Sequence, residues 1–99
     1  MPRFVPASVA ELQRVGLFAS LPGETLIRLA DDTERLEIPS GGRLGGTATT
    51  VDVLLTGLAR DSTGLLRPGH VVDGDATAVT QCVVARCDRA ALAAAIGQS

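Results

Sequence analysis

The sequence contains few aromatic residues and no lysine. Among its 99 residues Phe4 and Phe18 are the only phenylalanine, tyrosine or tryptophan residues, and all nine residues of the lysine and arginine class are arginine. Two rings provide no platform on which nucleic acid bases could stack. The charges are interspersed and sum to −2, so the sequence predicts no basic footprint for nucleic acid. We therefore expect no nucleic acid partner.

Long apolar runs are also missing. No stretch approaches the length of about 20 residues that a helix needs to cross a bilayer. The proline-rich start, Met1–Pro6, is too short for a signal peptide. We therefore expect a cytoplasmic protein that does not insert into membranes.

Cysteine is scarce, with one pair in the chain. Cys82 and Cys87 are five positions apart, so on a continuous strand their side chains point to opposite faces and cannot form a disulfide with each other. A metal site would need closer spacing and more ligands. The spacing therefore predicts two buried, reduced thiols.

Groups that could carry catalysis or bind a metal are few. His70 is the only histidine, and no nucleophile is paired with a base, so we expect neither an enzyme nor a cofactor. His70, Asp73 and Asp75 lie within six residues and could hold a divalent metal. One histidine and two carboxylates on a turn are more typical of solvated turn residues. We therefore predict no metal site.

The N-terminal third shows the signals of two helices. Ser8-Val9-Ala10-Glu11 is a capping box, and the helix that follows is predicted to end at Gly16. Leu17–Ala19 is interpreted as an apolar hinge. A second helix is expected to begin with Ser20 as its cap and Pro22 in its first turn. We expect an extended leader over residues 1–7 and a single domain over residues 8–99.

From Thr33 onward the apolar pattern alternates and turn residues become frequent, which indicates short strands. The longest predicted strand runs from Ala76 to Arg86. Asp88 is expected to cap a closing helix, Arg89–Ile96, which stops at Gly97. The other predicted strands are 34–38, 43–44, 51–55, 65–66 and 71–72. Thr56-Gly57 is expected to stop the strand 51–55, which residues 58–60 could continue.

The order of these elements and five short motifs resemble the cyclic-nucleotide-binding domain. This is the β-roll of catabolite-activator-type regulators, kinase regulatory subunits and gated channels. The resemblance implies an α+β fold: a small, truncated antiparallel β-roll, jelly-roll-like, with two N-terminal helices and one C-terminal helix. The motifs are Leu17-Phe18-Ala19-Ser20-Leu21-Pro22, Pro39-x-Gly41-x-x-Leu44, Val53-Leu54-Leu55-Thr56-Gly57, Leu66-Arg67-Pro68-Gly69 and Asp88-Arg89-Ala90-Ala91-Leu92.

The chain departs from this family at the ligand site. In the family a Pro-Gly turn leads to Phe-Gly-Glu, a short helix and an arginine. The glutamate takes the ribose hydroxyl, and the arginine and helix amides take the cyclic phosphate. Here Gly74-Asp75 stands where Gly-Glu is expected, and Ala76–Val79, which looks like the next strand, follows at once. The phosphate-binding helix and its arginine are deleted.

The resemblance and its broken site predict a module that has lost nucleotide binding. It would act as a protein-interaction, assembly or regulatory subunit, with another protein or itself as partner. The closing helix, through Arg89, Leu92 and Ile96, is the predicted interaction surface, because a helix that is apolar nearly all round needs cover. Alternatively, the roll itself covers this helix.

A second hypothesis keeps ligand binding. In this alternative, Gly74, Asp75 and Thr77 retain a cyclic nucleotide or another small anion, and the protein is a sensor. It requires a cation opposite Asp75, supplied by one of three arginines elsewhere in the chain: Arg43, Arg60 or Arg67.

Overall fold

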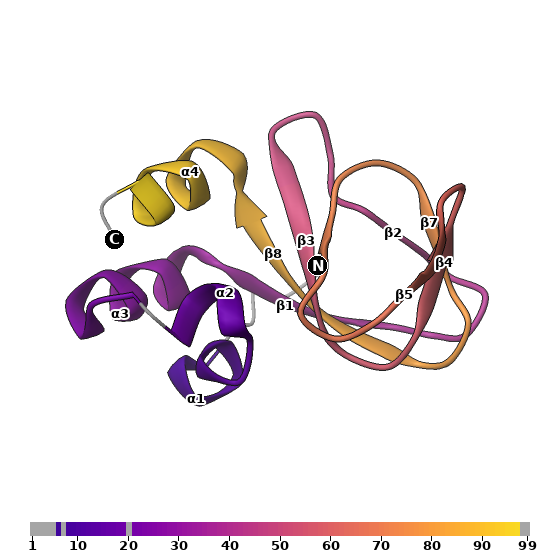
Figure 1. Cartoon of the computed structure of the whole chain (residues 1–99), viewed down its shortest axis with the longest axis horizontal. Helices are drawn as coiled ribbons and strands as arrows, with labels where there is room; N and C mark the ends of the chain where they lie inside the picture. The colour runs from indigo at the N-terminus through magenta and orange to yellow at the C-terminus, as the bar shows by residue number, and fades with distance from the viewer. Residues whose placement is uncertain (1–5, 7, 20, 98–99) are drawn as a thin grey trace, which may run out of the picture.

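The computed structural model describes residues 6, 8–19 and 21–97, with backbone only for Leu17, Ile96 and Gly97. It has three layers: helices, a first sheet, and a second sheet (Figure 1). The first sheet has strand order β1-β8-β3-β6 and the second β2-β7-β4-β5, and every pairing is antiparallel. The predicted α+β class and truncated antiparallel roll are confirmed.

Three helices precede the roll, where two were predicted. They are α1 (Val9–Gln13), α2 (Gly16–Ala19) and α3 (Gly23–Asp32). The predicted capping box is present, because the Glu11 amide donates to the Ser8 hydroxyl at 3.1 Å and the Glu11 carboxylate accepts from the Ser8 amide at 3.2 Å.

The predicted hinge over Leu17–Ala19 is wrong. The chain makes a further helical turn there, in which the amides of Phe18 and Ala19 donate to the Val15 carbonyl at 2.9 and 3.1 Å. The turn places Phe18 in the core with no exposed surface. Pro22 is the N-cap of α3 rather than a first-turn residue, and the predicted cap Ser20 lies outside the described residues.

Eight short strands form the roll, followed by α4 (Arg89–Gly97). The predicted cap of α4 is confirmed by the Asp88 carboxylate, which accepts from the Ala91 amide at 2.9 Å. The strands are β1 (Glu34–Ile38), β2 (Arg43–Leu44), β3 (Thr50–Thr56), β4 (Ala59–Asp61), β5 (Gly64–Leu66), β6 (Val71–Val72), β7 (Ala76–Ala78) and β8 (Cys82–Asp88).

One predicted strand is broken and the predicted stop at Thr56-Gly57 is confirmed, and both positions lie at the same crossing between the sheets. The expected strand Ala76–Arg86 is β7 in the second sheet and β8 in the first, because Val79 leaves the sheet and its amide donates to the Leu58 carbonyl. Likewise the chain after β3 turns at Gly57, with φ +90, and continues as β4 in the other sheet. A Cβ at Gly57 would lie 2.3 Å from the Gln81 carbonyl oxygen, so only glycine fits this close crossing.

The first sheet is covered on both faces. One buried cluster joins the helices to the first sheet, and a second lies between the two sheets. Cys87 belongs to the former and Cys82 to the latter, so the predicted placement of the thiols on opposite faces is confirmed. Burial raises the pKa of both thiols, and the Thr33 hydroxyl donates to the Cys87 sulfur at 3.6 Å.

Candidate functional site

The connection between β6 and β7 stands where the resemblance places the phosphate-binding helix. It has three residues, Asp73–Asp75, and forms no helix. Gly74, with φ +113, donates its amide to the Gly45 carbonyl at 3.2 Å. A Cβ on Gly45 would lie 1.5 Å from the Gly74 carbonyl oxygen, so the two backbones touch. The short connection is therefore closed against the loop that follows β2.

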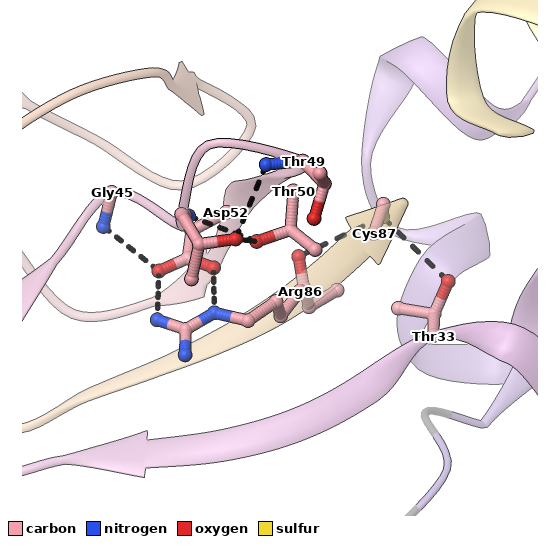
Figure 2. A network of polar contacts seen from close by, with 9 residues as sticks. Thr33, Gly45, Thr49, Thr50, Asp52, Arg86 and Cys87 are labelled. Atoms are coloured by element: carbon pink, nitrogen blue, oxygen red, sulfur yellow. Dashed lines mark hydrogen bonds and ion pairs between the residues drawn. The ribbon is translucent and has the colours of Figure 1, made fainter. Parts of the chain in front are cut away.

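An ion pair between Asp52 and Arg86 holds the same loop after β2, because its carboxylate also binds the Gly45 amide (Figure 2). Asp52 on β3 has no exposed surface and accepts from Arg86 on β8, at 2.8 Å from Nε and 3.0 Å from Nη2. The Gly45 amide donates to the same carboxylate at 2.8 Å. The carboxylate therefore accepts three hydrogen bonds, two from the Arg86 guanidinium and one from the Gly45 amide, and they offset the cost of burying its charge.

Sequence reasoning missed this pair. Its signal is an acid inside the otherwise apolar strand Val51–Leu55, which requires a buried partner. The partner, Arg86, is 34 positions away, and only the β3–β8 register places it opposite Asp52. The pair also raises the pKa of the Arg86 guanidinium through its hydrogen bonds to Asp52.

The predicted ligand-binding residues lie outside the roll. Gly74, Asp75 and Thr77 are all exposed, whereas Ala76 and Ala78, which alternate with Thr77, are buried between the sheets. Thr77 therefore faces outward from the second sheet. The structure does not gather these three residues around an interior pocket.

The arginines that the sensor hypothesis requires are placed by the strand register. Arg43 on β2 and Arg60 on β4 lie directly opposite Thr77, one on each side of β7. All three side chains are exposed on the outer face of the second sheet. Arg67 is exposed beyond the end of β5. None of these arginines forms an ion pair with Asp75 among the residues for which side chains are described.

The interior of the roll at this end is filled by aliphatic side chains. They pack between the two sheets with at most 9% of their surface exposed. The side chains are those of Leu44, Leu54, Leu66, Val72 and Ala76.

Two cavities border α4 instead. One, of about 160 Å³, lies between α3 and α4, and the other, of about 390 Å³, lies between α4 and the loop at Ala48 and Thr49. Both are lined on the α4 side by alanines. Both of these cavities therefore lie against the closing helix.

The predicted interaction residues of α4 have unlike surroundings. Arg89 donates to Asp73 at 2.5 and 2.8 Å, and these hydrogen bonds lower the pKa of the Asp73 carboxyl. Leu92 is 6% exposed and packs in the buried cluster between the helices and the first sheet, so its side chain does not lie on the surface of the domain. The side chain of Ile96 lies outside the described part. The exposed side chains of α4 include Ala90, Ala93 and Ala94.

The His70, Asp73 and Asp75 side chains are separately engaged or solvated. His70 accepts from the Arg67 amide through Nδ1 at 2.8 Å, and Asp73 is paired with Arg89. Over residues 6, 8–19 and 21–97, no group of three side chains is placed to hold a metal ion. Over the same residues no helix has the length and apolar character needed to span a membrane.

Comparison with solved structures identifies the fold as that of the cyclic-nucleotide-binding domain. A cyclic nucleotide-binding-like protein from Brucella abortus aligns with a TM-score of 0.61 and 24% identity, over 92% of this chain and 97% of that one. The sensor domain of the transcriptional regulator DNR from Pseudomonas aeruginosa aligns with a TM-score of 0.68 and 16% identity, over 91% and 74%.

A regulatory subunit of a cAMP-independent protein kinase A from Trypanosoma brucei, a mutant bound to cAMP, has the same fold. It aligns with a TM-score of 0.71 and 20% identity, over 90% of this chain and 42% of that one. No protein-family model and no curated protein matches the sequence. The neighbours therefore establish the fold, and the predicted resemblance is confirmed at that level.

Proposed function

We propose that this protein is a cyclic-nucleotide-binding-like module that binds no cyclic nucleotide and works as a protein-interaction or assembly subunit. The observation that supports this most strongly is the connection Asp73–Asp75. Three residues replace the helix that would hold the phosphate, and Gly74 closes against Gly45. The two backbones cannot separate to admit a nucleotide unless the hydrogen bond from the Gly74 amide to the Gly45 carbonyl breaks.

The placement of positive charge supports the same conclusion. A cyclic phosphate in an apolar roll needs a cation, because an unpaired buried charge is costly. Arg86, which comes from an inner strand, is neutralised by Asp52. Arg43 and Arg60 face outward from the second sheet. Asp75 in the connection is exposed and forms no ion pair with an arginine among the described side chains.

The surface of α4 supports an interaction role. Ala90, Ala93 and Ala94 are exposed, and small side chains let another backbone approach closely. Ala90 and Ala93 also line the 390 Å³ cavity with Ala48. We propose that a partner's apolar side chain enters this cavity, with Arg89 at its edge and Leu92 holding the helix in place from the core side.

Thermal unfolding with added cyclic AMP or cyclic GMP tests the proposed function. A ligand at 100 times its Kd stabilises the folded state by about 2.7 kcal/mol, which raises the midpoint by several degrees in a domain of this size. We expect an unchanged midpoint at millimolar nucleotide. A saturable rise would instead support the sensor alternative, with Gly74, Asp75 and Thr77 as its first candidate residues.

A further inference from the structure

We infer that this protein associates head to tail with copies of itself, by docking the outer face of its second sheet on the exposed face of α3 of the next copy. The inference rests on the assembly role proposed above and adds a second contact to it, in which the partner is another copy of this chain. The two surfaces are distinct from α4 and from the roll interior.

The first surface is a row of exposed side chains across the second sheet, which we call the arginine row. The register places Arg43 opposite Thr77, Thr77 opposite Arg60, and Arg60 opposite Leu65. Directly opposite residues share a face of the sheet, and all four are exposed. Within the described structure neither arginine of the row forms an ion pair.

The acidic groups near the arginine row leave it positive. Asp75 precedes Thr77 by two positions and therefore lies on the same side of β7, so it offsets one of the two arginines at most. Asp61 follows Arg60 directly and therefore lies on the other side of β4, where its carboxylate keeps its charge and accepts from the Thr63 hydroxyl at 2.6 Å and amide at 2.8 Å. An apolar side chain, Leu65, extends the row and is 44% exposed.

The second surface is the outward face of α3, which we call the acidic face. Ile27 is 54% exposed, the highest value among the exposed large apolar side chains of the described chain. Glu24 and Asp31 lie one turn before and one turn after it on the same face. Neither carboxylate is in an ion pair among the described side chains. Arg28, four positions after Glu24 and three before Asp31, neighbours both carboxylates on the helix surface and offsets one of them, while it also lines the groove toward α4.

The two surfaces match in spacing as well as in charge. Arg43 and Arg60 are two strands apart, which is about 10 Å at the usual strand separation. Glu24 and Asp31 are seven residues apart on a helix, which is also about 10 Å along its axis. A helix lying across the strands would therefore pair both charges at once.

The middle of each surface is also compatible. In that arrangement Ile27, between the carboxylates, would lie over Thr77, between the arginines. The threonine methyl and the aliphatic stems of the arginines would cover the isoleucine, whose exposed surface is otherwise left in water.

The fold places these surfaces on opposite sides of the molecule. The helices pack on one face of the first sheet and the second sheet packs on the other, so α3 and the arginine row face away from each other (Figure 1). Contact between unlike surfaces leaves a free acidic face at one end and a free arginine row at the other. Such contacts build open chains or closed rings rather than a two-fold dimer.

Sedimentation velocity of the full chain over a range of concentrations tests this contact. At an ionic strength of about 0.01 M charges interact over about 30 Å, and at 1 M over about 3 Å. We expect species heavier than the 10.2 kDa protomer that grow with concentration at low salt and revert to the protomer at high salt. A protomer at every concentration in low salt, or association that salt does not change, overturns the inference.

Charge reversal provides the decisive comparison. Arg43→Glu with Arg60→Glu makes both surfaces acidic, and Glu24→Arg with Asp31→Arg makes both basic. Each double variant alone is expected to remain a protomer. An equimolar mixture restores opposite charges at both kinds of contact, so it should recover the wild-type mass distribution. A mixture that stays a protomer while the wild type associates overturns the proposed contact.

Arg14 is exposed and lies on neither surface, so Arg14→Glu is the matched control for the single reversal Arg60→Glu. Both change the net charge equally, so only Arg60→Glu should reduce association. Circular dichroism of each variant checks that the fold is retained. If the chain is a protomer and nucleotide still leaves the unfolding midpoint unchanged, the head-to-tail contact fails while the proposed function stands.

Discussion

At the scale of single residues, the most consequential feature is the unequal burial of the Asp52–Arg86 pair. The aspartate side chain has no exposed surface, whereas the arginine side chain is 26% exposed. Removing either partner breaks the same two hydrogen bonds. The cost therefore depends on which charge is left behind, because a buried carboxylate cannot reach water and a partly exposed guanidinium can.

This asymmetry predicts different stabilities for two variants. Arg86→Met leaves Asp52 buried with only the Gly45 amide as a donor, and we expect a loss of about 3–5 kcal/mol. Asp52→Asn keeps the shape and leaves Arg86 free to solvate, and we expect about 1–2 kcal/mol. Urea denaturation measures both. Equal losses, or a larger loss for Asp52→Asn, would contradict this account of the pair.

A second prediction concerns Gly45, whose backbone touches Gly74. Gly64 provides a matched control, because its φ of +130 equals the +131 of Gly45 within a degree, yet a Cβ there meets nothing within 4 Å. Alanine at either position carries similar backbone strain. Gly45→Ala should cost about 1–3 kcal/mol more, because it also forces the two loops apart. Similar melting curves for the two variants would contradict this prediction, because they would show that the two loops separate at little cost in free energy.

At the scale of elements, an ion pair ties the first helix to the edge strand of the first sheet. The Glu11 carboxylate of α1 accepts from Arg35 Nε of β1 at 2.9 Å. Burial alone raises the pKa of Glu11, but hydrogen bonds from Arg35 and Ser8 outweigh it and the pKa is lowered. This contact fixes the helical layer against the roll at its N-terminal end.

The lowered pKa of Glu11 predicts a pH dependence of stability. A group with a lowered folded-state pKa contributes stability above its unfolded pKa, about 4.3 for glutamate, and the contribution is lost as pH falls through the folded-state pKa. Glu11→Gln should therefore reduce the free energy of unfolding at pH 7, and the difference from wild type should shrink below about pH 4. Urea titrations at both pH values measure it. A difference that stays constant between them would exclude this linkage.

The elements also show what could be read from the sequence. The Ser8 capping box, the strand over residues 34–38 and the Asp88 cap depend on neighbours within four positions, and the structure confirms them. The end of β3 was marked by Thr56-Gly57, but the break after β7 was missed because a run of apolar residues does not reveal where a strand changes sheets. The Asp52–Arg86 pair was missed for a similar reason, since its partners meet only through the β3–β8 register.

At the scale of the whole molecule, the layers separate three surfaces. The roll interior is filled, α4 borders the two cavities, and the arginine row and acidic face lie on opposite sides. The family resemblance placed a ligand in the roll, whereas the structure leaves exposed charge and apolar surface on the outside.

The most direct test of this account is titration calorimetry of the purified chain with cyclic AMP and cyclic GMP up to millimolar concentration. Because the β6–β7 connection has three residues and Arg86 is held by Asp52, we predict no saturable heat with either nucleotide. Heat that saturates at micromolar concentration would contradict the account, since it would require Gly45 and Gly74 to separate and a nucleotide site to form inside the roll.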